Sequence, residues 1–220
     1  KNFGATVTQL GWLMASYSAM QFLFSPVWGS ISDRIGRRPV MLISIHGSVA
    51  AFTILGFADS LLWLFVGRIF AGISGANIST AAAYIADTTT TENRAKGMGI
   101  IGAGFGLGFI FGPAIGGILS HWGYSTPMFA AAALSLANLI LAFAILEEPK
   151  VDAATRAANW TRRFDWKSFN EIVFGDVRTL SAVVIFFIVT FAFTQVEVSF
   201  ALYMLKRFEY GPSQAGGLLA

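Results

Sequence analysis

Two ionisable residues lie inside long apolar stretches of the sequence, where a charged side chain needs a partner or water. Arg68 lies within residues 61–86 and Glu197 within residues 179–205. A charge in a lipid-spanning helix costs several kcal/mol, so such a residue is expected to face a wet cavity or a partner. Burial in a low-dielectric environment favours the neutral form of a carboxyl group, so Glu197 is expected to take up a proton near neutral pH.

A second interpretation stays open for each residue. Arg68 lies about two helical turns from one end of its stretch, within reach of the membrane surface for a long side chain. Glu197 could instead be a protonated acid that is hydrogen-bonded to a neighbouring helix. We favour a functional site at both positions.

Helical geometry, at about 100° per residue, places small and polar residues beside Arg68. Gly72, Gly75 and Ser79 share its face of the helix. Asn77 falls on the opposite side, so we expect it to hydrogen-bond another helix.

The same geometry gives Glu197 a polar face. Thr190 and Thr194 lie within about 70° of it around the helix. In the first apolar stretch, Gln21 shares a face with two serines. Those side chains could line a path through the protein, although a polar seam between helices is the simpler interpretation.

One acid and three arginines are grouped in residues 29–39, called the basic loop below. The arginines are Arg34, Arg37 and Arg38. Asp33 lies among them, which predicts a small ion-pair network at a membrane face. Gly29 is expected to allow close contact between helices, and Gly36 a tight turn. Taken alone, the segment also fits a simple basic anchor on one side of a membrane.

Glycines follow a regular spacing in the fourth apolar stretch. The pattern comprises Gly99, Gly108, Gly112, Pro113, Gly116 and Gly117. Together with Gly104, glycines recur every four residues and form one stripe along a helix, which lets another helix approach closely. Pro113 lacks a backbone donor and is expected to bend that helix. Generic packing is the alternative explanation.

Composition indicates a membrane protein. Of 220 residues, 55% are hydrophobic and 12% are charged, whereas about 25% of an ordinary soluble domain is charged. A bilayer core about 30 Å thick needs about 20 apolar residues per helix, and six stretches qualify. They are Leu10–Ser30, Val40–Ala58, Leu61–Ala86, Ala95–Ser120, Met128–Leu146 and Thr179–Leu205.

Other chemistry is not indicated. The sequence has no cysteine, and His46 and His121 stand alone, so we expect no metal site. His46 is expected to be a core histidine. We find no nucleophile with a base, no paired-carboxylate site and no phosphate-binding loop. An enzyme, a cofactor and a nucleic-acid partner are therefore not expected.

Lysine and arginine predict the orientation. Those in the connections on one side are Arg34, Arg37, Arg38, Arg94, Lys96, Lys150, Arg156, Arg162, Arg163, Lys167 and Arg178. The opposite side has Lys1, Lys206 and Arg207. The first side is predicted to be cytoplasmic because basic loops stay inside.

Three motifs together resemble a known family. The basic loop reads G-x-x-x-D-R-x-G-R-R, which is similar to the signature loop of the major facilitator superfamily. The glycine pattern resembles the fifth-helix motif of the antiporters in that superfamily. Arg68 with Gly72 and Gly75 resembles its fourth-helix arginine motif. The closest subfamily resemblance is to drug:proton antiporters of the tetracycline-efflux type.

The resemblance implies an all-α fold of twelve helices in two bundles, of which this chain would supply about helices 2 to 7. Residues 1–146 would belong to the N-terminal bundle, 147–178 to a cytoplasmic central loop, and 179–220 to the C-terminal bundle. It also implies that Asp87 pairs with Arg34 or Arg37 in a cytoplasmic gate. Helix capping or solvation of Asp87 is the competing interpretation.

The function implied by the resemblance is proton-coupled export of small amphipathic molecules by alternating access. A monomer of the full-length protein would act in a bilayer, the expected location being a bacterial inner membrane. Whether Glu197 or an acid in the first helix couples the proton is left open. A facilitator or proton symporter for metabolites is the main alternative, and a membrane scaffold is a third.

Overall fold

Helices account for every regular element in the part of the chain that the structure describes. The computed structural model describes residues 4–149, 174–208, 214 and 218, without the side chains of 193–198, 201–202 and 205–206. The elements are α1 (Val7–Ile35), α2 (Arg37–Phe57), α3 (Leu61–Gly75), α4 (Ile78–Thr88), α5 (Thr91–Leu119), a short 3₁₀ helix η1 (Ser120–Trp122), α6 (Thr126–Ile145) and α9 (Val177–Phe208). The all-α prediction is confirmed.

Local sequence signals set several of the helix ends. Thr6 and Gln9 form a reciprocal capping box at the start of α1. Gly36, with φ +110°, is the only residue between α1 and α2. The basic loop is thus mostly helical, because a glycine in the positive-φ region turns the chain within one residue. Asp176 caps α9 by accepting hydrogen bonds from Thr179 and the Arg178 amide, which lower the pKa of its carboxyl group.

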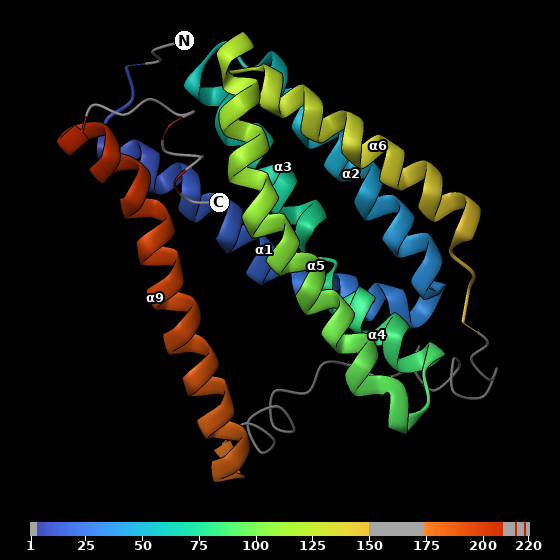
Figure 1. Ribbon diagram of the computed structural model, residues 1–220. Coiled ribbons are helices and arrows are strands. Elements are labelled where there is room, and N and C mark those ends of the chain that lie inside the picture. The colour runs from blue at the N-terminus through green and yellow to red at the C-terminus, as the bar shows by residue number, and fades with distance from the viewer. Residues whose placement is uncertain (1–3, 150–173, 209–213, 215–217, 219–220) are drawn as a thin grey trace.

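The first four helices and α6 form the packed part of the molecule. In Figure 1, α6 lies along α2, while α3 lies between α2 and α1. The buried apolar side chains are mainly small, among them Val40, Ala51, Ala71 and Ala132. Small residues let helix backbones approach closely in lipid, where no hydrophobic effect drives helices together. Helix α9 stands apart from this group in the view.

Four helical stretches in the described part are long and apolar enough to cross a membrane. They are Arg37–Phe57, Leu61–Thr88, Thr91–Trp122 and Thr126–Ile145. Val177–Ala192 is a shorter apolar helix within α9. The 29 residues of α1 are long enough, at about 1.5 Å per residue, but polar side chains dilute its hydropathy. For α1 and α9, the predicted spans therefore remain predictions.

The predicted span Leu61–Ala86 is found as one long apolar stretch, Leu61–Thr88, but its helix is interrupted in the middle. The chain forms two helices, α3 and α4, separated by Ala76 and Asn77. A Ser74–Gly75 pair ends α3, and such pairs weaken the helical hydrogen-bond ladder. The predicted core position of His46 is wrong: it lies on the exposed face of α2.

The glycine stripe on α5 faces open space in the described structure. An added Cβ at Gly99, Gly104, Gly108, Gly112 or Gly116 would meet no described atom within 4 Å. Gly117, in contrast, is buried. Close approach of another helix to the stripe therefore remains a prediction.

Gly72 supplies the first test of this packing. A Cβ there would run into the backbone carbonyl of Tyr17 in α1, and overpacking of this kind costs about 1–3 kcal/mol. We expect Gly72→Ala to lower the midpoint of thermal unfolding in detergent. Gly11→Ala in α1 is the control, because its Cβ would meet nothing within 4 Å. Equal midpoints for the two variants would contradict the close contact between α1 and α3.

Candidate functional site

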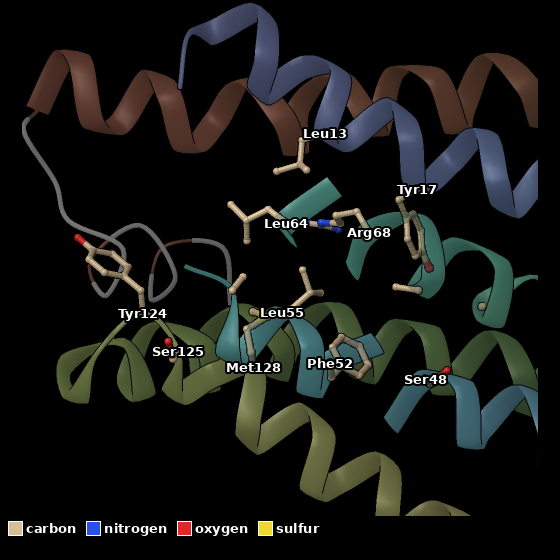
Figure 2. A pocket seen from close by; sticks show the side chains of 13 residues that line it. Leu13, Tyr17, Ser48, Phe52, Leu55, Leu64, Arg68, Tyr124, Ser125 and Met128 are labelled. Atoms are coloured by element: carbon tan, nitrogen blue, oxygen red, sulfur yellow. The ribbon is translucent and has the colours of Figure 1, made fainter. Parts of the chain in front are cut away.

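A cavity of about 420 Å³ opens between α1, α2, α3 and the start of α6. Figure 2 shows the side chains that surround it. They include Leu13 and Tyr17 from α1, Ser48, Phe52 and Leu55 from α2, Leu64 and Arg68 from α3, and Tyr124, Ser125 and Met128 beside the start of α6. Most of the wall is apolar, with hydroxyl groups at a few places, as in sites that bind small organic molecules.

Arg68 contributes the formal positive charge of this cavity wall. Its guanidinium carbon lies 5.9 Å from the centre of the Tyr17 ring, within range of a cation–π interaction worth about 0.5–2 kcal/mol. In Figure 2 the Arg68 side chain lies between Leu64 and Tyr17. The structure therefore places Arg68 between helices, beside an aromatic ring that sequence reasoning did not single out. Tyr17 could not be found from spacing because it comes from another helix.

The other residues expected near Arg68 separate into two groups. Gly75 lines the cavity, and Gly72 packs against Tyr17. Ser79 lies beyond the helix break and donates to the Ser25 carbonyl at 3.1 Å.

Gln21 and Asn77 both make contacts between helices. Gln21 donates from its side-chain amide to the Gly75 carbonyl at 3.2 Å. This contact fits the polar seam that was the simpler of its two interpretations. Asn77 donates to the Ser44 hydroxyl of α2 at 2.6 Å, so the predicted interhelical hydrogen bond is confirmed.

The predicted proton site lies in α9. Thr190 is exposed, and the side chains of Thr194 and Glu197 fall outside the described residues. A meeting of this polar face with the Arg68 cavity therefore remains a prediction.

Arg37 is the centre of an ion-pair network at the opposite end of the bundle. Its guanidinium contacts Asp33 at 2.6 Å and Asp87 at 2.9 Å. It also donates to the Ser32 hydroxyl at 2.6 Å. Arg37 is thus the partner that joins Asp87, at the end of α4, to the basic loop. Gly29 has a smaller role than expected, because an added Cβ would lie 3.7 Å from the Ser79 hydroxyl, an ordinary contact.

Glu148 completes this end of the bundle, and sequence reasoning missed it. Its two carboxylate oxygens accept hydrogen bonds from the backbone amides of Arg37 and Arg38, each at 2.8 Å. These amides start α2, where a helix leaves donors without partners and its dipole attracts negative charge. A Cβ on Gly36 would approach the Glu148 carboxylate to 2.6 Å. The available signal was an acid placed just after an apolar helix.

Arg38 makes a second connection between α2 and α6. It donates to the Phe143 carbonyl at 3.0 Å, and its guanidinium carbon lies 5.4 Å from the centre of the Phe143 ring. With the Arg37 and Glu148 contacts, this brings the α1–α2 junction, the end of α4 and the end of α6 together. Of the connections predicted to share one membrane side, the first loop, the end of α4 and the described residues just after α6 lie at one end of the bundle.

These features define an integral membrane protein. The helices are long and apolar, and small residues lie at their contacts. An arginine lies beside a cavity within the bundle, and an ion-pair network lies at one end. The chain belongs to the Major Facilitator Superfamily, whose family model matches residues 1–220.

Relatives with assigned names cover nearly all of the chain. It is 36% identical over 214 residues to the class C tetracycline resistance protein of Escherichia coli, spanning 96% of this chain and 52% of that protein. It is 28% identical over 218 residues to multidrug resistance protein 2 of Bacillus subtilis, spanning 96% and 53%. The chain thus covers about half the length of these relatives.

A solved structure agrees with the fold. The crystal structure of the human organic anion transporter MFSD10 (TETRAN) superimposes with a TM-score of 0.72 at 27% identity, over 95% of this chain and 53% of that one. The superfamily fold expected from the three motifs is confirmed.

Glu148 gives a test of how the junction between the start of α2 and the end of α6 is held together. Glu148→Gln replaces one acceptor oxygen by a donor, so one of the two α2 amides loses its partner. We expect faster hydrogen exchange at Arg37 and Arg38, and a loss of stability of about 1–3 kcal/mol. Hydrogen exchange read by mass spectrometry over residues 36–41 measures this directly.

Glu147→Gln is the matched control, since it removes the same charge from the exposed neighbouring residue. Equal exchange of the α2 amides in the two variants would show that Glu148 does not cap α2.

Proposed function

We propose that the full-length protein is a secondary active transporter that exports small amphipathic molecules, including drugs of the tetracycline type, in exchange for protons. It acts as a carrier and not as an enzyme, as a monomer in a lipid bilayer, in our proposal the inner membrane of a bacterium. Named tetracycline and multidrug resistance relatives support this assignment. The single observation that supports it most strongly is Arg68 beside Tyr17 at a largely apolar cavity between helices.

The cavity has properties that suit such a substrate. Aromatic and aliphatic side chains can contact the apolar part of an amphipathic molecule, while Arg68 can bind an anionic or enolic oxygen. A charge is costly away from water in a membrane, so a positive charge at this place is expected to serve binding or proton coupling. We propose Arg68, Glu197, Thr194 and Thr190 for the substrate and proton pathway. Gln21 and Ser79 would support that pathway from the α1 seam.

The ion-pair network suits a gate. Arg37 joins Asp33 and Asp87 over 2.6 Å and 2.9 Å, and exposed or half-buried ion pairs of this kind are individually weak. A gate needs contacts that can break and re-form with modest energy, because each ligand shifts the equilibrium only by its differential affinity for the two states. We propose that this network holds the cytoplasmic gate of the carrier closed.

Transport into inverted membrane vesicles tests the proposal. With an imposed pH gradient, we expect labelled tetracycline to accumulate, and accumulation to disappear when the gradient is dissipated. Accumulation that ignores the gradient would favour a facilitator. Uptake of sugars or other metabolites with protons would favour a symporter. Absence of any transport would contradict the carrier assignment.

Glu197 supplies a prediction on coupling. Glu197→Gln removes the group that would exchange the proton, so we expect gradient-driven accumulation in inverted vesicles to fall at least tenfold while the protein still reaches the membrane. Glu147→Gln, outside the apolar spans, is the control and should transport normally. Undiminished export by Glu197→Gln would remove Glu197 from the mechanism.

Tyr17 supplies a prediction on the cavity. Tyr17→Phe keeps an aromatic face toward Arg68, whereas Tyr17→Leu removes it. A lost cation–π contact of about 1 kcal/mol corresponds to roughly a fivefold weaker interaction. We therefore expect the KM for export to rise several-fold in Tyr17→Leu and to change little in Tyr17→Phe. Equal KM values in the two variants would show that the ring does not act through its face.

A further inference from the structure

The apolar stretch that carries Arg68 is interrupted near its middle. Helix α3 ends at Gly75 and α4 begins at Ile78. The Ala76 amide donates to the Ile73 carbonyl at 3.4 Å, which closes a turn between residues three apart. The following helix begins where the Ala81 amide donates to the Asn77 backbone carbonyl at 3.0 Å. An interruption in lipid requires other partners for the released backbone groups, because water is not available there.

Two side chains of α1 supply those partners. Trp28 donates from its indole nitrogen to the Ile73 carbonyl at 2.6 Å, and Gln21 donates to the Gly75 carbonyl at 3.2 Å. In a continuous α-helix these carbonyls would accept from the amides of Asn77 and Ser79, four residues on. At the break, the Gly75 carbonyl therefore accepts from Gln21, and the Ile73 carbonyl accepts from Trp28 as well as from the Ala76 amide.

The same face of α1 continues past the break. Gln21, Ser25 and Trp28 are spaced i, i+4 and i+7, so they share one face. Ser79, from the first turn of α4, donates to the Ser25 carbonyl. Pro26 lies at the same level of α1 but on another face, and it deprives α1 of one backbone donor there. The backbone hydrogen bonding of α1 and that of the α3–α4 span are therefore both interrupted where these helices meet.

The break separates the two functional parts of this span. Arg68, at the cavity, is in α3, and Asp87, which contacts Arg37, is in α4. At the break, the Asn77 side chain also connects this span to α2 by its 2.6 Å hydrogen bond to the Ser44 hydroxyl. A change of angle between α3 and α4 would move Asp87 relative to Arg68 without unfolding either helix.

We propose that the Ala76–Asn77 interruption is a hinge that connects the Arg68 cavity to the Arg37–Asp87 ion pair, and that Gln21 and Trp28 are its positioning residues. By donating to the Ile73 and Gly75 carbonyls, they stabilise the interrupted form against a continuous helix. The role of the hinge in transport rests on the proposed function, whereas the existence of the interruption does not.

Distance measurements between spin labels test the hinge. The sequence has no cysteine, so cysteines can be introduced in the full-length protein at Leu62, which is 71% exposed, and at Thr88, which is also exposed. A continuous helix would separate these positions by about 39 Å along its axis, and a bend would shorten that distance. Pulsed electron paramagnetic resonance resolves the two populations.

Each variant removes one donor and keeps either an aromatic ring or a side chain of similar length. Trp28→Phe removes the indole N–H, and Gln21→Met removes the amide. Each is expected to raise the ratio of the long to the short distance about tenfold, since the carbonyl loses its α1 partner in the interrupted form and regains a backbone amide in a continuous helix. Trp12→Phe is the matched control, because Trp12 is on the same helix and 67% exposed; its distances should equal those of the wild type.

Transport kinetics separate a hinge from a binding wall. We expect the maximal export rate of both variants to fall at least fivefold with KM within twofold of the wild-type value. Unchanged distances in Trp28→Phe and Gln21→Met would overturn the hinge whatever the export rate. A raised KM with unchanged distances would instead assign the residues to the substrate path. If the wild type exported nothing, the proposed function would fail, while the distances would still decide whether the break is held by α1.

Discussion

Polar groups in the interior of a bilayer must find partners within the protein, and this constraint accounts for most of the contacts described above. The Ile73 and Gly75 carbonyls accept from α1 side chains, Asn77 reaches Ser44 of α2, and the Arg68 guanidinium lies beside the Tyr17 ring. Hydroxyl groups of serine and threonine bond carbonyls of their own helix in the same way. Each contact removes an unsatisfied group whose cost in hydrocarbon is several kcal/mol.

At the end of the bundle that contains Arg37, charged side chains are the partners that connect the helices. One carboxylate, Glu148, lies at the start of α2 and accepts hydrogen bonds from the backbone amides of Arg37 and Arg38. Arg37 then reaches Asp33 and Asp87. The signature motif and the end of α6 are consequently one unit, although more than a hundred residues separate them in the sequence. A glycine at position 36 serves both the turn and the space that Glu148 fills.

Small residues make these contacts possible. Gly72 lies against the backbone of α1, and a Cβ on Gly67 would meet the Leu55 side chain of α2. Lipid is as apolar as a leucine side chain, so close packing and interhelical hydrogen bonds replace the hydrophobic effect as the force between helices. Arg68 can then lie between helices that are close enough to seat it beside Tyr17.

The sequence by itself determined the class of the protein, because long apolar runs, basic connections and three spaced motifs depend only on residue type and order. Helical geometry also indicated the interhelical role of Asn77, and the family resemblance implied the pairing of Asp87 with the basic loop. Only the tertiary structure decided the partners that lie far apart in the chain, such as Tyr17 with Arg68 and Glu148 with α2. It also revealed the break after Gly75, since whether a Ser–Gly pair interrupts a helix depends on donors from a neighbouring helix, and no pattern within one helix records them.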